Sequence, residues 1–162
     1  MLTVAPTAKV SPLADIEDSV RGSNIRIGDG AVIDSFVKVK PAGGSGDLVI
    51  GANTVINSGT VIYTGNGVTI GANVAIAANC TLAPTNHEFR DKSKNINQQG
   101  FMESRGGIVI EDDVWIGANA VLLDGAVVRR GAVIGAGSVV RDELPPYSIN
   151  VGTPAQTIGY RK

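Results

Sequence analysis

The chain contains a single histidine, His87, in the segment 84–90. A neutral imidazole is the side chain best suited to accept a proton near pH 7, so His87 is a candidate general base. Asn86 and Glu88 flank it and could hold the ring in one tautomer. A solitary loop histidine is usually a solvated surface residue, so this interpretation depends on the elements that position the segment.

Aliphatic residues recur at a step of six, which fits neither a helix of 3.6 residues per turn nor a simple alternating strand. Two residues before each of them stands Val, Ile, Leu, Ala, Thr, Ser or Cys, and side chains two apart in a strand share a face. The series contains fifteen hexads, marked by Ile27, Ile33, Val39, Ile50, Ile56, Ile62, Ile70, Ile76, Leu82, Ile110, Ile116, Leu122, Val128, Ile134 and Val140.

Gly, Asn or Asp stands three residues after the aliphatic position in eleven of the fifteen hexads. These residue types tolerate the positive φ of a sharp corner. A short strand and a tight corner in every hexad predict a three-sided coil, and stacked coils would pair into three parallel sheets. The predicted fold is therefore an all-β parallel β-helix of about five 18-residue coils, filled by small aliphatic side chains.

Breaks in the six-residue step show where the chain leaves this prism. We expect small insertions at 41–46 and 65–67 and a projecting loop at 83–107, and long loops on a regular scaffold are usually functional. The predicted single domain has a capping coil at 1–24, hexapeptide coils at 25–82 and 108–143, and a C-terminal tail at 144–162. Pro145-Pro146 is expected to end the repeat, and the tail is expected to fold back over open strand edges.

Two further residues gain a meaning from the hexad phase. Trp115 lies between the inward positions Val114 and Ile116, so it must point outward, either as a subunit contact or as a flat wall for an acyl or pantetheine chain. Cys80 occupies an inward position and is interpreted as core.

Composition excludes several classes of function. The formal net charge is −1 and the pI is near 5.8, which gives no basic excess for binding nucleic acid or an anionic membrane. One cysteine allows no intrachain disulfide. Residues 1–18 lack a signal-peptide pattern, and no apolar run is long enough to span a membrane, so a cytoplasmic location is expected.

The sequence from about residue 25 to 158 resembles the hexapeptide-repeat acyltransferases, and residues 108–158 look most like the branch of maltose, galactoside and lipopolysaccharide sugar O-acetyltransferases. The resemblance rests on the hexads, on Asn86-His87 and on four motifs: Val-Trp-Ile-Gly at 114–117, Gly-Ala-Gly-Ser-Val-Val at 135–140, Pro-Pro-Tyr-Ser at 145–148 and Gly-Thr-Pro-Ala at 152–155. It implies a left-handed winding, a homotrimer, acetyl-CoA as co-substrate, no metal, and sites in clefts between subunits.

The same resemblance assigns roles to individual residues. His87 would be the general base, and an acceptor hydroxyl would attack the thioester directly, without an acyl-enzyme. Asn57 matches a residue that contacts the acceptor or the catalytic pair, with Asn86 and Glu88 beside the acceptor. The backbone N–H of Ala118 matches a group that stabilises the oxyanion. The remaining acetyl-CoA contacts would come from Trp115, Gly117, Gly135, Ala136, Arg141, Arg161 and Lys162.

The sequence therefore predicts an acetyl-CoA-dependent O-acetyltransferase acting on a sugar or sugar-lipid hydroxyl, in bacterial surface polysaccharide biosynthesis. Three alternatives remain open. The first is an N-acetyltransferase of a nucleotide-linked amino sugar, although many of those enzymes carry an extra domain ahead of the prism. The second is a zinc hydratase, which needs three histidines on one metal. The third is a non-catalytic β-helix scaffold, which would leave the 83–107 loop without a purpose.

Overall fold

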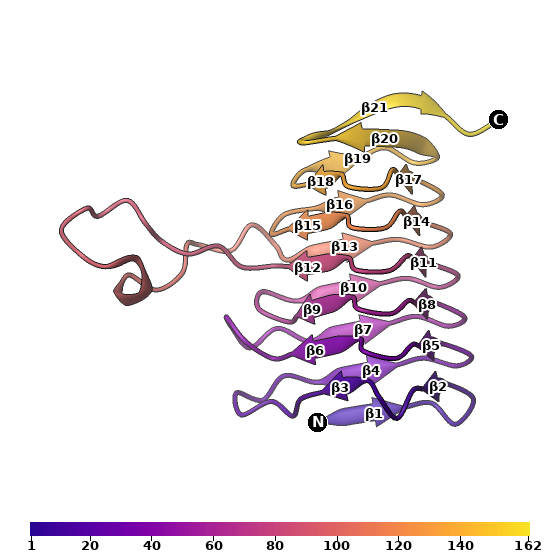
Figure 1. Ribbon diagram of the computed structural model, residues 1–162, viewed down its shortest axis with the longest axis horizontal. Helices are drawn as coiled ribbons and strands as arrows, with labels where there is room; N and C mark the ends of the chain where they lie inside the picture. The colour runs from indigo at the N-terminus through magenta and orange to yellow at the C-terminus, as the bar shows by residue number, and fades with distance from the viewer.

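The hexads form strands of two or three residues, which the computed structural model, describing residues 1–162, arranges in three parallel sheets around one axis (Figure 1). Sheet A contains β1 (Leu2–Val4), β4 (Ile25–Ile27), β7 (Leu48–Ile50), β10 (Val68–Ile70), β13 (Ile108–Ile110), β16 (Val127–Val128) and β19 (Glu143–Leu144). Sheet B contains β2 (Lys9–Val10), β5 (Val32–Ile33), β8 (Val55–Ile56), β11 (Ala75–Ile76), β14 (Trp115–Ile116), β17 (Val133–Ile134), β20 (Ser148–Gly152) and β21 (Ala155–Tyr160). Sheet C contains β3 (Asp15–Ile16), β6 (Lys38–Lys40), β9 (Val61–Tyr63), β12 (Thr81–Ala83), β15 (Val121–Leu123) and β18 (Val139–Val140). The fold is a left-handed parallel β-helix, which confirms the predicted class.

Small side chains fill the interior of the prism. All fifteen hexad aliphatics and the fifteen residues two positions before them are buried, Cys80 included, and the buried hydrophobic core contains no aromatic side chain. The inward hydroxyls have partners: Thr54 Oγ1 donates to the carbonyl of Gly71 at 2.7 Å and accepts the N–H of Val74 at 3.1 Å. A core of this width has no room for larger groups, so polar chemistry has to lie outside it.

The corners use positive φ as the sequence predicts. All eleven Gly, Asn and Asp corner residues have positive φ, and Phe36 adopts φ 63° at the equivalent position of another corner. The Phe36 side chain is 65% exposed, so its ring lies in solvent and not in the prism. The backbone of the winding therefore imposes the corner conformation even on an aromatic residue.

The two ends of the prism differ. Residues 1–24 form a coil in which β1, β2 and β3 pair with the coil above. Sheet B continues past Pro145-Pro146, where the sequence predicted the repeat to end, because both prolines lie between β19 and β20 and so remove no ladder hydrogen bond. β20 pairs in parallel with β17, and β21 folds back antiparallel on β20. The tail therefore covers the edge of sheet B, whereas β19 and β18 remain the edges of sheets A and C.

The three insertions leave the prism at one corner, where sheet C passes to sheet A. Residues 41–46 follow β6, residues 65–67 follow β9, and the longest insertion follows β12. Figure 1 shows this last insertion as an arm that projects far from the stacked coils. Its only helical segment is η1 (Ile96–Gln98), and no helix of the chain is long and apolar enough to cross a bilayer. Three successive coils thus place their insertions side by side.

Candidate active site at the corner of sheets C and A

His87 lies on a short antiparallel neck at the root of the arm. The N–H of Glu88 donates to the carbonyl of Gly100 at 3.0 Å, and the N–H of Met102 donates to the carbonyl of Asn86 at 2.8 Å. Between these two bonds, His87 and Phe101 form a β-bridge. The pairing fixes the backbone that carries the imidazole, so the histidine is presented by an ordered element.

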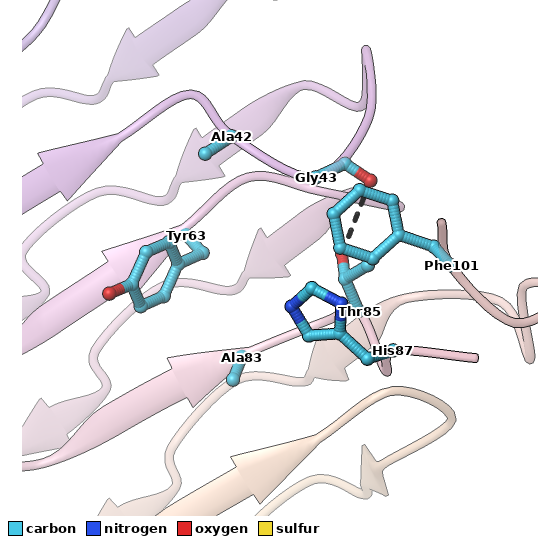
Figure 2. Close-up of a pocket in the computed structure, with 7 residues that line it drawn as sticks. All are labelled: Ala42, Gly43, Tyr63, Ala83, Thr85, His87 and Phe101. Carbon is cyan, nitrogen blue, oxygen red and sulfur yellow. Dashed lines mark hydrogen bonds between the residues drawn. The ribbon is translucent and has the colours of Figure 1, made fainter. Parts of the chain in front are cut away.

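The imidazole ring is exposed and packs on one side against Phe101. Their ring centroids are 4.9 Å apart, with an angle of 39° between the ring planes. Figure 2 shows the imidazole on the Phe101 side of an open space, with Tyr63 on the other side. The imidazole makes no hydrogen bond within the chain, which leaves both ring nitrogens available to ligands.

Glu88 does not hold the His87 ring. Its carboxylate binds the Arg90 guanidinium and accepts the main-chain N–H groups of Phe89 at 2.9 Å and Arg90 at 3.0 Å. These contacts, led by the Arg90 side chain, lower the pKa of Glu88 to about 2. Asn86 takes part in the neck through its carbonyl. Glu88 therefore orders the turn beyond the histidine and stays ionised.

A pocket of about 290 Å³ opens beside His87 (Figure 2). Three coils and the arm contribute to it, and no charged side chain lines it. The lining residues are Ala42, Gly43, Tyr63, Ala83, Thr85, His87 and Phe101. Of these the sequence identified only His87, because the other residues come together through contacts between insertions that no periodic pattern encodes.

Asp124 anchors the other end of the arm. It is 1% exposed, and its two carboxylate oxygens accept the N–H groups of Arg105 and Gly107, each at 2.8 Å. The Arg105 side chain also pairs with Asp142 at 2.8 Å. This role could not be predicted from the sequence, since Asp124 precedes Gly125 like an ordinary corner residue.

Several predicted acetyl-CoA contacts lie together at the corner where sheet B passes to sheet C. Asn57, which was predicted to contact the acceptor, lies with them and does not line the His87 pocket. Asn57, Gly117 and Gly135 each follow the inward aliphatic of a sheet B strand and form one column. A Cβ on Gly117 would lie 2.5 Å from the nitrogen of Ala136, so only glycine fits there. The N–H of Ala118 donates no hydrogen bond within the chain, which leaves it free for an acceptor. The side chain of Asn57 donates to the carbonyl of Ile76 at 2.8 Å.

Trp115 points outward from sheet B, as predicted, and is 56% exposed. It shares a hollow of about 320 Å³ with Arg161 at the end of the tail. The guanidinium of Arg161 contacts Asp113 at 2.9 Å and the carbonyl of Gly131 at 3.0 Å, so much of its charge is already compensated.

The other two basic residues among the predicted acetyl-CoA contacts lie elsewhere. Arg141 lies at the corner of sheets C and A and pairs with Asp142 at 3.3 Å, and Lys162 is exposed at the chain end. The structure therefore does not bring the three cations together.

The two halves of the predicted site lie on different faces of one chain. The His87 pocket is at the corner of sheets C and A, and it contains none of the predicted acetyl-CoA contacts. Trp115, Gly117 and Ala118 lie on sheet B and at the corner of sheets B and C. The structure of one chain therefore does not bring His87 together with the predicted acetyl-CoA contacts.

Comparison with known proteins identifies the same repeat and the same fold. Residues 107–142 match the family described as bacterial transferase hexapeptide (six repeats). A hexapeptide-repeat acetyltransferase from Vibrio cholerae, complexed with acetyl-CoA, superposes on 87% of this chain and 72% of its own, with a TM-score of 0.67 and 27% identity. The chain belongs to the hexapeptide-repeat acyltransferase superfamily. The assignment to the sugar O-acetyltransferase branch stays a prediction.

Two other members of the superfamily show how its acceptors vary. A mutant of AntD, an N-acyltransferase from Bacillus cereus in complex with dTDP-4-amino-4,6-dideoxyglucose and coenzyme A, superposes on 98% of this chain and 83% of its own, with a TM-score of 0.82 and 25% identity. A 2,3,4,5-tetrahydropyridine-2,6-dicarboxylate N-acetyltransferase from Staphylococcus aureus is 47% identical over 55 residues. That match covers 34% of this chain and 23% of the relative.

Replacing Asp124 with Ala should loosen the root of the arm, because two main-chain N–H groups lose their acceptor. We expect the free energy of unfolding to fall by about 2–4 kcal/mol and the amide hydrogen of Gly107 to exchange about 10–100 times faster. Asp124→Asn should also fail to anchor the arm, since its NH₂ group would face one of the two N–H donors and cannot accept a hydrogen bond from it. Asp142→Ala is the matched control, because it removes only exposed ion pairs, to Arg105 and to Arg141. Equal exchange at Gly107 in the Asp124 and Asp142 variants would contradict the anchoring role.

Proposed function

We propose that this protein is an acetyl-CoA-dependent acetyltransferase that modifies a hydroxyl group of a sugar of the kind found in bacterial surface polysaccharides. The observation that carries the proposal is one exposed imidazole, held on an ordered neck at the mouth of an uncharged pocket, on a hexapeptide-repeat prism. An imidazole in this position can take a proton from an acceptor and later release it.

The reaction needs a single attack. His87 accepts the proton of the acceptor hydroxyl while the oxygen attacks the thioester carbonyl of acetyl-CoA. The carbonyl oxygen becomes an oxyanion, and the free N–H of Ala118 from a neighbouring subunit is the candidate donor to it. Collapse of the tetrahedral intermediate breaks the carbon–sulfur bond, and the departing thiolate takes the proton from the imidazolium of His87. No residue is acylated in this scheme, because the acceptor oxygen attacks the thioester directly.

The uncharged lining of the pocket favours a hydroxyl acceptor. An amino sugar enters largely as an ammonium ion, which loses hydration in the pocket and finds no carboxylate there. The nearest carboxylate in sequence, Glu88, is already bound to Arg90. A neutral hydroxyl has no such cost.

The second candidate is an N-acyltransferase acting on a nucleotide-linked amino sugar. The structural likeness to AntD supports it, since the AntD complex contains dTDP-4-amino-4,6-dideoxyglucose and coenzyme A. The superposition covers 83% of the AntD chain, so most of that N-acyltransferase consists of the fold that this chain shares. The two candidates share the donor and His87 but differ in the acceptor atom.

We further propose that the active form is a homotrimer with one site between each pair of subunits. The outward positions along sheet B form an apolar column, which a second copy could cover: Val32, Val55, Ala75, Trp115, Val133 and Ile149. Such packing would bring the sheet B side of one subunit towards the His87 pocket of the next.

Replacing His87 with Ala should lower turnover by about 10²–10⁴-fold, because the acceptor hydroxyl loses its base. Calorimetric binding of CoA should be retained, since the donor contacts lie on another face. Lys92→Ala, an exposed change elsewhere on the arm, is the control and should keep the wild-type rate. A His87→Ala protein with full turnover would remove the imidazole from the mechanism.

A hydroxyl sugar and its amino analogue, offered at equal concentration and in the same nucleotide-linked or free form, distinguish the two candidates. The uncharged pocket leads us to expect a higher kcat/KM for the hydroxyl compound, with the widest margin near pH 7, where more of the amino analogue is an ammonium ion, and a narrower margin near pH 9. Mass spectrometry of the product identifies the acetylated atom. A kcat/KM in favour of the amine at every pH would support the N-acyltransferase and reject the hydroxyl acceptor.

Mixed trimers test whether each site is shared between subunits. A trimer made only of His87→Ala chains should have a low turnover rate. A trimer made only of Trp115→Ala chains should have a low rate at low acetyl-CoA concentration, because its donor contact is weakened. Co-refolded at equal amounts, the two chains should regain about a quarter of the wild-type rate, because one interface in four then joins an intact His87 to an intact Trp115. Co-refolding without any gain, in trimers verified by native mass spectrometry, would place both residues in one subunit's site.

A further inference from the structure

We propose that Tyr63 and Ala42 determine which acceptor is used, and that the pocket beside His87 binds the ring of a single neutral sugar. This inference rests on the proposed function and adds to it the acceptor class and the residues that select it. Three properties of the pocket carry it: the residues that form the walls, the rigid packing behind them, and their lack of charge.

Tyr63 forms the wall opposite the imidazole. It ends β9, where it pairs in register with Lys40 of the coil below, and its side chain is 36% exposed. Figure 2 shows the Tyr63 and His87 rings on opposite sides of the open space, with Ala42 and Ala83 lining it between them. An aromatic ring facing a catalytic base offers a flat apolar surface to the C–H face of a sugar, whose hydroxyls then point along the pocket towards the imidazole.

The insertion at 41–46 forms a rigid wall that carries Ala42. The carbonyl of Ala42 accepts the N–H of Gly65 at 3.1 Å, and the N–H of Gly46 donates to the carbonyl of Gly65 at 2.8 Å. A Cβ on Gly44 would lie 2.3 Å from the carbonyl oxygen of Gly65, and a Cβ on Gly46 would lie 2.1 Å from the nitrogen of Gly67. The glycines of this run thus allow two insertions to pack backbone against backbone. A larger side chain at position 42 has to extend into the pocket, because the wall behind it cannot retreat.

The arm fixes the third side. Thr85 lies against the same insertion, with its hydroxyl 3.5 Å from the carbonyl of Gly43. A Cβ on Gly65 would also collide with the Thr85 hydroxyl. The distance across the pocket is therefore set by contacts among three insertions, and a single ring fits its volume of about 290 Å³ better than an oligosaccharide does.

The charges around the pocket are paired with each other and face elsewhere. Lys40, below Tyr63, lies 3.5 Å from a carboxylate oxygen of Glu17, and Glu88 binds Arg90. The polar groups left to a ligand are the imidazole, the Thr85 hydroxyl as an acceptor, and main-chain groups, whereas the Tyr63 hydroxyl points away from the imidazole (Figure 2). A uronate or an ammonium group would lose hydration without gaining a counter-charge, so a neutral ring is favoured.

The first test measures KM for acceptor and donor separately. Ala42→Leu and Tyr63→Ala should each raise the acceptor KM by about tenfold or more, while the KM for acetyl-CoA changes by less than about twofold. Tyr63→Phe keeps the ring and should recover most of the loss. Ala52→Leu makes the same change as Ala42→Leu at a half-buried alanine outside the pocket and should match wild type. Circular dichroism and native mass verify that each variant folds and assembles.

The second test compares a neutral methyl hexoside with the methyl hexuronoside of the same configuration. The wild-type enzyme should favour the neutral compound by about tenfold or more in kcat/KM. Equal use of the two, or pocket variants that alter only the acetyl-CoA KM, would overturn the inference while leaving the proposed function in place. Failure of the proposed function has a different signature, namely no acetylated sugar from the wild-type enzyme or full activity in His87→Ala.

Discussion

The width of the prism interior is the constraint on which the rest of the structure depends. Each side of each coil contributes two inward side chains, and all thirty in the five hexapeptide coils are buried. Sides with strands of two or three residues, closed by tight corners, keep the walls close to the axis, so only small branched residues fit. No aromatic side chain enters this core, and Phe36, at a corner, lies in solvent. Catalytic groups therefore have to be carried outside the sheets, and insertions have to leave at corners, where they break no ladder.

Much of the fold follows from the sequence because the hexad phase is repeated so often. It predicts the strands, the burial of Cys80, the outward direction of Trp115 and the positive φ of Asn53 or Gly131. The continuation of sheet B past Pro145-Pro146 was not predicted. Prolines interrupt a strand, but in the turn between two strands they remove no hydrogen bond of the sheet. The pocket was missed for another reason. Ala42, Thr85 and Phe101 meet through contacts between three insertions, and those contacts have no period that a single sequence displays.

The same regularity explains why the predicted acetyl-CoA contacts and the His87 pocket lie on different faces of the prism. Flat sheets and tight corners make shallow hollows, and the pocket beside His87 owes its depth to the insertions at 41–46 and 83–107. No insertion stands beside the column of Asn57, Gly117 and Gly135, where the glycines allow neighbouring coils to approach closely. In the proposed trimer, each subunit would offer this column to the pocket of the next, because identical prisms would pack around a common axis. Assembly would then supply the cleft that the winding alone does not form.

Glu88, the residue after His87, contributes its carboxylate to the structure of the arm and not to the pocket. Glu88 binds Arg90 and two main-chain N–H groups, and these contacts lower its pKa from 4.5 to about 2. A carboxyl group with a lowered pKa stabilises the folded state above its unfolded pKa, and this contribution is lost only as the pH falls from 4.5 towards 2. The turn next to His87 therefore keeps its geometry throughout the range near neutral pH. A change of activity with pH in that range reports on the groups that take part in proton transfer, because Glu88, which orders the turn beside the histidine, stays ionised there.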